Sequence, residues 1–299
     1  MKGSKEAVAI WQQIPNNMRL TLLNNVFCGN CGTAVGISDA TAKIYDDSFL
    51  IHGNCIECGH NVVRHIEDLI KPSGDDHAAK LMKLASYAKN SKFNQMLEDL
   101  IPLQIRDSGL WDPISSGLFE DEDESENDPT EQIIYKDVLA KGSRYCWEME
   151  QVLPGHDPDD LDCPILQGIA IREAEGISAG IAHFKSLIKV DPRCLDAYAH
   201  IGNTYFNMSG RQAKSMAKTY YKQGVAIGLK FIGNHINDVF SWGLIDNRPF
   251  LRCLEGFGLC LLEQGKTQDA LSVFKHMLLL NPLDNQGIRF IIDEHQEEI

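Results

Sequence analysis

The sequence predicts a mainly α-helical protein with a small β section near its amino terminus. Short runs rich in β-branched and aromatic residues, separated by turn-forming residues, lie between residues 20 and 66 and predict strands. From His77 onward, apolar residues recur at helical spacing. A helix–turn–helix pattern then repeats from about residue 161. These observations predict a small β module followed by stacked helices.

Composition excludes some classes of protein and favours others. A chain of 299 residues with 43% hydrophobic composition can bury a core, and its length suggests two domains or one domain with appendages. No apolar run approaches the ~20 residues of a membrane span, so we expect no membrane partner. Nine scattered cysteines fit reduced thiols in a cytoplasmic protein. The net charge of −14 disfavours nucleic acid as a partner.

The first predicted elements are a short helix and a set of strands. In residues 1–17, the stretch KEAVAIWQQ places Ala7, Ile10 and Trp11 on one helical face, which predicts a short amino-terminal helix. The runs LTLLNNVF, AKIY, FLIHG and NVVRHI follow and predict the only β-rich section of the chain.

Two cysteine pairs with equal spacing interrupt this section. They form a C-x2-C, 23-residue, C-x2-C pattern: Cys28, Cys31, Cys55 and Cys58. Two such turns can present four thiolates in the tetrahedral geometry that suits Zn²⁺. Gly32 and Gly59 follow the pairs, where a tight curl of the backbone often needs the positive φ that glycine permits. We expect a closed, structural metal site.

On these residues, positions 18–68 resemble the zinc ribbon family, and we assign residues 18–70 to such a module. A rubredoxin-like iron site has the same ligands and is the less favoured alternative. A redox dithiol is disfavoured because two equivalent pairs are present. The histidines nearby could replace a ligand, but we expect them around the site or facing solvent: His52, His60 and His65. Zinc ribbons often bind nucleic acid, whereas this one has more acidic than basic residues.

A helical connector and an acidic linker come next. Residues 71–118 contain the amphipathic stretches HAAKLMKLASYA and KFNQMLEDLI, the second with Ser91 as a possible cap. Residues 119–131 include EDEDESEND, which has seven acidic residues and no apolar one, so it predicts a solvated linker and a domain boundary. The stretch from Ile133 to Leu153 then predicts a helix or a broken helix pair.

Residues 132–299 predict a helical array built from repeats. Residues 251–282 place large, small and turn residues where the 34-residue tetratricopeptide repeat has them: Leu254, Phe257, Gly258, Leu261, Gly265, Ala270, Phe274 and Pro282. The array therefore resembles that family, with repeats at about 161–194, 195–228 and 251–284 and an insertion at 229–250. The ending NPLDNQGIRF, with NRPFLR, resembles a variant found in bacterial proteins of unassigned function.

The resemblance implies a binding groove lined by the first helix of each repeat. Its residues would be Arg172, Asn203, Phe206, Arg252, Glu255, Leu259 and Leu262. The expected partner is a protein or peptide of unknown identity, and the expected function is that of a non-enzymatic scaffold or adaptor. The carboxylate-clamp subfamily is disfavoured, because Ile165 and Gly256 stand where basic or amide residues are needed. A zinc-ribbon transcription-associated factor and an enzyme with an unrecognised site are the alternatives.

Overall fold

The computed structural model describes residues 2–296 apart from 5–6, 9–10, 12–13, 15, 46–47, 67–76, 114, 117, 119–132 and 157–162. The chain divides into two compact units, Met1–Asp76 and His77–Ile299. The fold is mainly α with a small β section, as the sequence predicts. The acidic linker at 119–131 lies outside the described residues.

The amino-terminal unit is built on two small sheets. One sheet has the order β1-β4-β5-β6, and its strands are β1 (Lys2–Gly3), β4 (Ile37–Tyr45), β5 (Ser48–Cys55) and β6 (Asn61–Ile66). The other pairs β2 (Val26–Cys28) with β3 (Thr33–Val35) in antiparallel register. Phe49 and Ile51 of β5 are fully buried, and the Trp11 ring stacks on Phe49 with centroids 6.3 Å apart. These contacts form the core of the unit.

One local prediction for this unit is wrong, and the structure describes another only in part. The strand prediction for residues 20–24 is wrong, because α2 (Asn16–Asn24) continues to the residue before Asn25. The run LTLLN holds three leucines and one β-branched residue, and a short apolar run of helix formers does not separate helix from strand. Of the expected amino-terminal helix, the structure describes helical backbone at Ala7, Val8 and Trp11.

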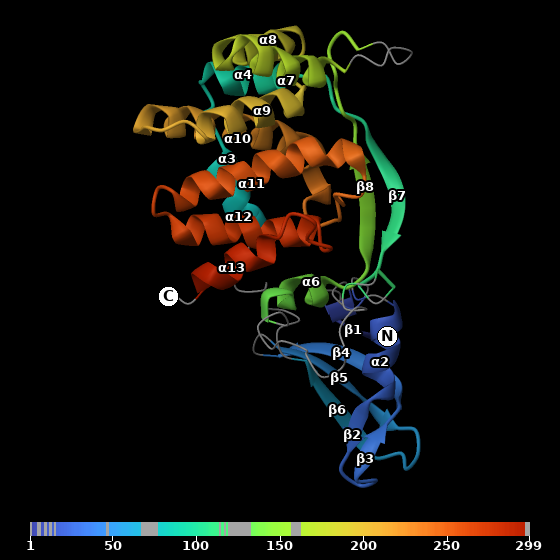
Figure 1. Ribbon diagram of the computed structural model, residues 1–299. Helices are drawn as coiled ribbons and strands as arrows, with labels where there is room; N and C mark the ends of the chain where they lie inside the picture. The colour runs from blue at the N-terminus through green and yellow to red at the C-terminus, as the bar shows by residue number, and fades with distance from the viewer. Residues whose placement is uncertain are drawn as a thin grey trace. The chain divides into compact units, whose positions relative to one another are not determined.

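Three consecutive helix pairs form most of the second unit. Their members are α7 (Pro164–Glu175), α8 (Ile177–Val190), α9 (Leu195–Phe206), α10 (Arg211–Ile232), α11 (Arg248–Leu262) and α12 (Thr267–Leu280). Figure 1 shows the pairs stacked in chain order, with each helix against its partner. Short turns join the helices within each pair: Gly176, at positive φ, caps the end of α7, and Gly265, also at positive φ, lies in the turn after α11.

The same contact recurs in all three pairs. A glycine of the first helix lies against an aromatic ring of the second: Gly168 on Phe184, Gly202 on Tyr221, and Gly258 on Phe274. A Cβ added at these glycines would lie 2.5, 2.5 and 2.4 Å from the ring atoms, so a side chain there would force the helices apart. Each ring is almost completely buried. The repeated pairing of a small with a large residue therefore sets the close approach of the helices.

The segments before the array belong to its core. Helices α3 (His77–Ala85) and α4 (Lys92–Asp99) contribute Leu81 and Leu97 to the hydrophobic cluster that contains Phe274. Strand β7 (Ile105–Trp111) pairs antiparallel with β8 (Arg144–Met149), which follows the short helix α6 (Lys136–Lys141). The segments on either side of the acidic run are thus hydrogen-bonded to each other. The division between the units falls at residues 76 and 77, whereas the sequence predicts a boundary at the run.

Two predictions for this region are wrong. Residues 20–66 are not the only β-rich section, and residues 144–149 form a strand where the sequence predicts helix. The pattern is misleading because β7 is exposed at five of its seven positions and has no alternation of apolar and polar residues. Its pairing with β8, and the bridge between Cys146 and Val239, stabilise the extended backbone instead.

The insertion at 229–250 is largely part of the core. Helix α10 continues to Ile232, and the short turns η1 (Gly233–His235) and η2 (Ile245–Asn247) complete the connection to α11. Phe240 and Phe250 are fully buried in the main cluster. The last helix, α13 (Ile288–Gln296), packs against α12. Within the described part of the chain, no helix combines the length and apolar composition that crossing a membrane requires.

Candidate metal centre and helical face

The two cysteine pairs lie in equivalent backbone turns of the amino-terminal unit. Cys28 ends β2 and Cys55 ends β5. The N–H of Gly32 donates to the carbonyl of Cys28 at 2.8 Å, and the N–H of Gly59 donates to the carbonyl of Cys55 at 2.9 Å. Both glycines have positive φ, +67° and +71°, as the sequence predicts. Each turn therefore curls its two sulfurs toward one point.

The four sulfurs fit one tetrahedral ion. Their Sγ atoms all lie within 4.8 Å of one another. Cys28 and Cys58 are 3.6 Å apart, and Cys31 and Cys55 are 3.9 Å apart. A tetrahedron with Zn–S bonds of about 2.3 Å has S···S edges of about 3.8 Å. The four predicted ligands are thus brought together, and these two distances match the S···S edges of a Zn²⁺ site.

Burial and hydrogen bonding differ among the four thiols. Cys28 and Cys55 are buried, whereas Cys58 is exposed. The backbone N–H of His60 and the side chain of Asn30 lower the pKa of Cys58 to about 6, so this sulfur is a thiolate at neutral pH. Its hydrogen bond with Cys31, together with desolvation, raises the pKa of Cys31 to about 12. Cysteine binds a metal ion as the thiolate, so a bound cation would displace the proton of the Cys31 thiol.

Four cysteines alone make up the ligand group among the described residues. His52 and His60 lie outside it. Four sulfur ligands complete the coordination of Zn²⁺, so no position is left for water or substrate. The arrangement can therefore hold the two turns together and is not suited to catalysis at the ion.

The predicted groove residues lie on helices α7, α9 and α11, and α9 packs against α11. Arg252 donates to the Asp196 carboxylate at 2.8 Å, and Arg172 donates to the Thr204 hydroxyl at 3.4 Å. Helices α9 and α11 are parallel neighbours, so positions seven residues beyond Asp196 and Arg252 also lie at one level. From this spacing we expect Asn203 and Leu259 on the same side of the two helices. We call this surface of α7, α9 and α11 the first-helix face.

A tyrosine from the second helix of a pair reaches this face. Tyr221 of α10 donates its hydroxyl to Oδ1 of Asn203 at 2.5 Å. Its ring occupies the space beside two glycines, since a Cβ at Gly202 or Gly256 would lie 2.5 or 2.2 Å from it. Asn203 is exposed, and because its Oδ1 already accepts this bond, its Nδ2 is the group left to donate. The hydrogen bond from Tyr221 therefore orients the Asn203 amide so that its Nδ2 can donate a hydrogen bond.

The other predicted groove residues are in mixed environments. Leu259 and Leu262 are half-buried against the main cluster. Phe206 lies at the end of α9 with the ammonium of Lys214 4.0 Å from its ring centroid. Glu255 accepts a hydrogen bond from Gln286 at 2.6 Å, and burial raises the pKa of its carboxyl. The face is therefore partly apolar, and several of its polar groups are already paired.

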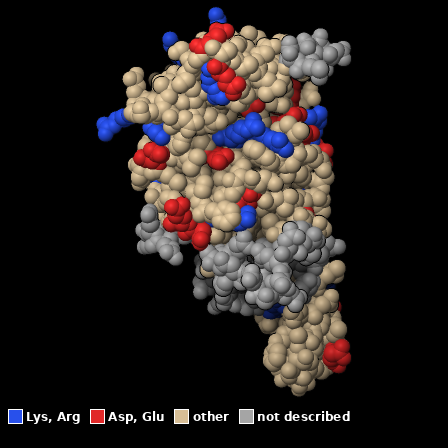
Figure 2. All heavy atoms as spheres, viewed as in Figure 1, with Lys and Arg blue, Asp and Glu red and all other residues tan. Residues whose placement is uncertain are grey.

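Charge on the first-helix face is largely balanced. Asp196 and Arg252 neutralise each other, and the Asp196 side chain is only 7% exposed. Burial lowers the pKa of His200, which stacks on Phe184, so its imidazole is neutral at physiological pH. Figure 2 shows a group of basic side chains near the middle of the helical unit with acidic side chains around it. No large surface of one sign is visible on the side shown.

Sequence patterns did not identify Asp196, Thr204, Gln286 or the role of Tyr221. Each is a partner that fixes a predicted groove residue, and partners on other helices have no local signature. The sequence signal for Tyr221 was Gly256, because this glycine stands where a basic or amide residue is expected and leaves space for the Tyr221 ring. No known protein-family model matches the sequence, and no curated protein matches it.

Proposed function

We propose that this protein is a peptide-binding scaffold with a structural zinc ribbon and a tetratricopeptide-like groove, and that it is not an enzyme. The four sulfurs at tetrahedral spacing support the zinc ribbon. A unit of this size has a small core, and metal binding contributes on the order of 10 to 16 kcal/mol in zinc-finger peptides. We therefore expect the amino-terminal unit to need its ion for folding.

The repeated glycine–aromatic contacts support the second part of the proposal. They fall in three successive helix pairs, at the positions where the sequence resembles the tetratricopeptide repeat. Stacked helix pairs of this kind leave one side of the first helices without a covering helix. In this chain that surface is the first-helix face.

One observation carries the binding function: the amide of Asn203 is oriented by Tyr221 and remains exposed. The hydrogen bond from Tyr221 fixes the orientation of this surface amide. An amide held in this way donates to a peptide carbonyl without losing side-chain entropy on binding. The half-buried Leu259, which we expect on the same side, offers an apolar contact for a neighbouring side chain of the peptide.

The test is selection of peptides from a random library on the full-length, metal-loaded chain. Affinities of a selected peptide are then measured by isothermal titration calorimetry with three variants. Asn203→Ala should weaken binding at least about tenfold, and Tyr221→Phe should weaken it several-fold because the amide loses its orientation. Asn234→Ala, an exposed asparagine away from this face, is the matched control. Equal affinities for all variants, or no selected peptide, would contradict the proposal.

A further inference from the structure

Two arginine side chains share one indole ring where α11 begins. The guanidinium carbon of Arg248 lies 5.3 Å from the ring centroid of Trp242, and that of Arg252 lies 5.6 Å from the same centroid. The two arginines are four positions apart on the helix, so their side chains project from the same side of α11. A cation is attracted to the face of an indole ring at such distances. Trp242 therefore holds two positive charges near each other.

Hydrogen bonds orient both guanidinium groups. Nε of Arg248 donates to the backbone carbonyl of Trp242 at 3.0 Å, and Nη1 of Arg252 donates to the carboxylate of Asp196 at 2.8 Å. The backbone N–H of Trp242 donates to Oδ1 of Asn281 at 3.0 Å, which fixes the loop that carries the ring. Among the described residues, neither guanidinium makes a further hydrogen bond, although each has five N–H donors. Several oriented donors therefore remain free on each arginine.

Arg248 is an exception to the charge balance of the first-helix face. Its guanidinium forms no ion pair within the part of the chain that the structure describes. Asp246, in the turn before α11, is paired with Arg106 at 3.0 Å, and Glu255 accepts a hydrogen bond from Gln286 at 2.6 Å. The amino end of α11 adds a partial positive charge. In a chain of net charge −14, this local positive charge favours an anionic group on the partner.

On the basis of the proposed peptide-binding function, we infer that the bound peptide carries an aspartate or glutamate whose carboxylate is received by Arg248 and Arg252. An arginine can donate two parallel N–H···O bonds to a carboxylate, and a planar guanidinium that is already oriented loses less side-chain entropy on binding. Arg248 supplies the unpaired positive charge. Arg252 shares its charge with Asp196 and supplies free N–H donors. The partner is therefore an acidic peptide.

Helix geometry predicts where the acidic residue lies in the peptide. Arg252 bonds to Asp196 in the first turn of α9, and Asn203 is seven residues further along the same helix. At about 1.5 Å per residue, Asn203 lies about 10 Å along α9 from that level. An extended peptide covers about 3.3 Å per residue, so we expect the acidic residue about three positions from the residue whose carbonyl accepts a hydrogen bond from Asn203.

The test uses peptides selected from a random library on the full-length, metal-loaded chain, with affinities measured by isothermal titration calorimetry. Selected sequences should share an aspartate or glutamate at one position, and replacing it by its neutral amide should weaken binding at least about tenfold. Arg248→Gln should weaken binding of the acidic peptide about tenfold. The same variant should leave binding of the amide peptide nearly unchanged, because both changes remove one interaction. Arg252 is not replaced, because the buried carboxylate of Asp196 would lose its partner.

A matched variant separates this site from a general effect of charge. Arg211→Gln removes the same charge from an exposed position on α10, the second helix of its pair, and should change affinity by less than about twofold. Equal effects of Arg248→Gln and Arg211→Gln would overturn the inference. Selected peptides that depend on Asn203 but share no acidic residue would also overturn it, while leaving the proposed function in place. If no peptide is selected, the proposed function and the inference both fail.

Discussion

The stacking of the helix pairs predicts a large loss of stability for Phe274→Ala. Phe274 is fully buried, and its ring lies against Gly258 at the centre of the third pair. A buried phenylalanine removes about 150 to 250 Å² from water, worth about 4 to 6 kcal/mol at ~25 cal/mol per Å². Measured losses for Phe→Ala in cores are about 3 to 5 kcal/mol. We expect the free energy of unfolding to fall by about 4 kcal/mol, a large part of the usual 5 to 15 kcal/mol.

The assay is urea unfolding followed by far-UV circular dichroism, which reports mainly on the helical unit. Phe290→Ala is the matched control, because Phe290 is 64% exposed on α13, where the guanidinium of Arg289 lies 4.4 Å from its ring centroid. We expect the control to lose about 1 kcal/mol or less. The contradictory result is that Phe274→Ala lowers the free energy of unfolding no more than Phe290→Ala does, with an unchanged slope of that free energy against urea concentration. That result would show that the glycine–aromatic contact does not stabilise the pair as we argue.

Three further predictions concern polar contacts. The pKa of Asp137 is lowered, mainly by its hydrogen bond with His77. The interaction therefore contributes about 1 kcal/mol or less to the free energy of unfolding above the ordinary carboxyl pKa, and this contribution is lost as pH falls from about 5 to 2. Urea midpoints should depend less on pH in that window for Asp137→Asn, and an unchanged dependence would contradict this. Asp284 accepts one backbone N–H on each carboxylate oxygen at the start of α13, so Asp284→Ala should cost about 1 to 2 kcal/mol in thermal unfolding. Asp284→Asn keeps one acceptor oxygen and should cost less than Asp284→Ala; equal losses would refute the capping role. A double-mutant cycle of Asp196 and Arg252 should give a coupling of about 1 kcal/mol, and strict additivity would show that the pair does not link α9 to α11.

The metal centre could be predicted from sequence because all of its determinants are local. Each Cys-x-x-Cys-Gly stretch fixes its own turn, and the positive φ of Gly32 and Gly59 follows from the same few residues. Only the distance between the two turns needed the fold, and the β4–β5 hairpin provides it. Helices α7 to α12 were also predictable, since small and aromatic residues recur at fixed spacing in them.

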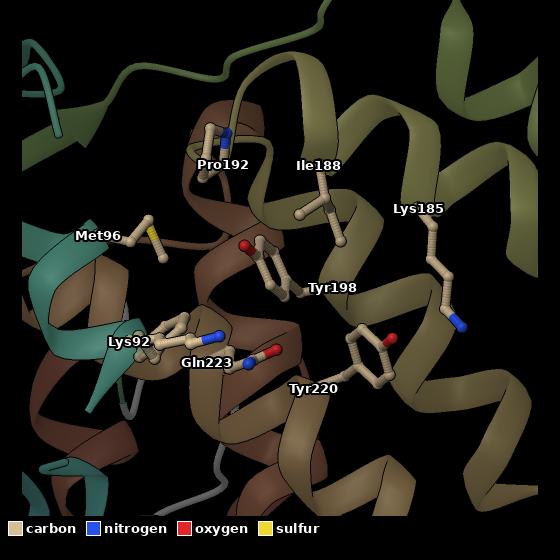
Figure 3. A pocket seen from close by; sticks show the side chains of 9 residues that line it. Lys92, Met96, Lys185, Ile188, Pro192, Tyr198, Tyr220 and Gln223 are labelled. Carbon is tan, nitrogen blue, oxygen red and sulfur yellow. The ribbon is translucent and has the colours of Figure 1, made fainter. Parts of the chain in front are cut away.

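The parts that were mispredicted depend on long-range contacts. Strand β7 is mostly exposed and is stabilised by pairing with β8, more than 30 residues away, across the acidic run. A pocket lined by Tyr198 forms only because α4, a helix predicted as part of a connector, packs on the array beside α8 and α10 (Figure 3). Hydrophobic spacing identifies which side of α4 is apolar, but it does not identify which helices that side will contact.

The most direct test of the account is the metal content of the purified protein by elemental analysis, with the quadruple replacement of Cys28, Cys31, Cys55 and Cys58 by Ser as the comparison. We predict about one zinc per chain, lost in the variant, together with loss of β structure in the amino-terminal unit and retention of helical circular dichroism. A protein that contains no metal, or contains iron, or keeps its zinc after the replacement, would contradict the assignment of these four thiols as a structural zinc site.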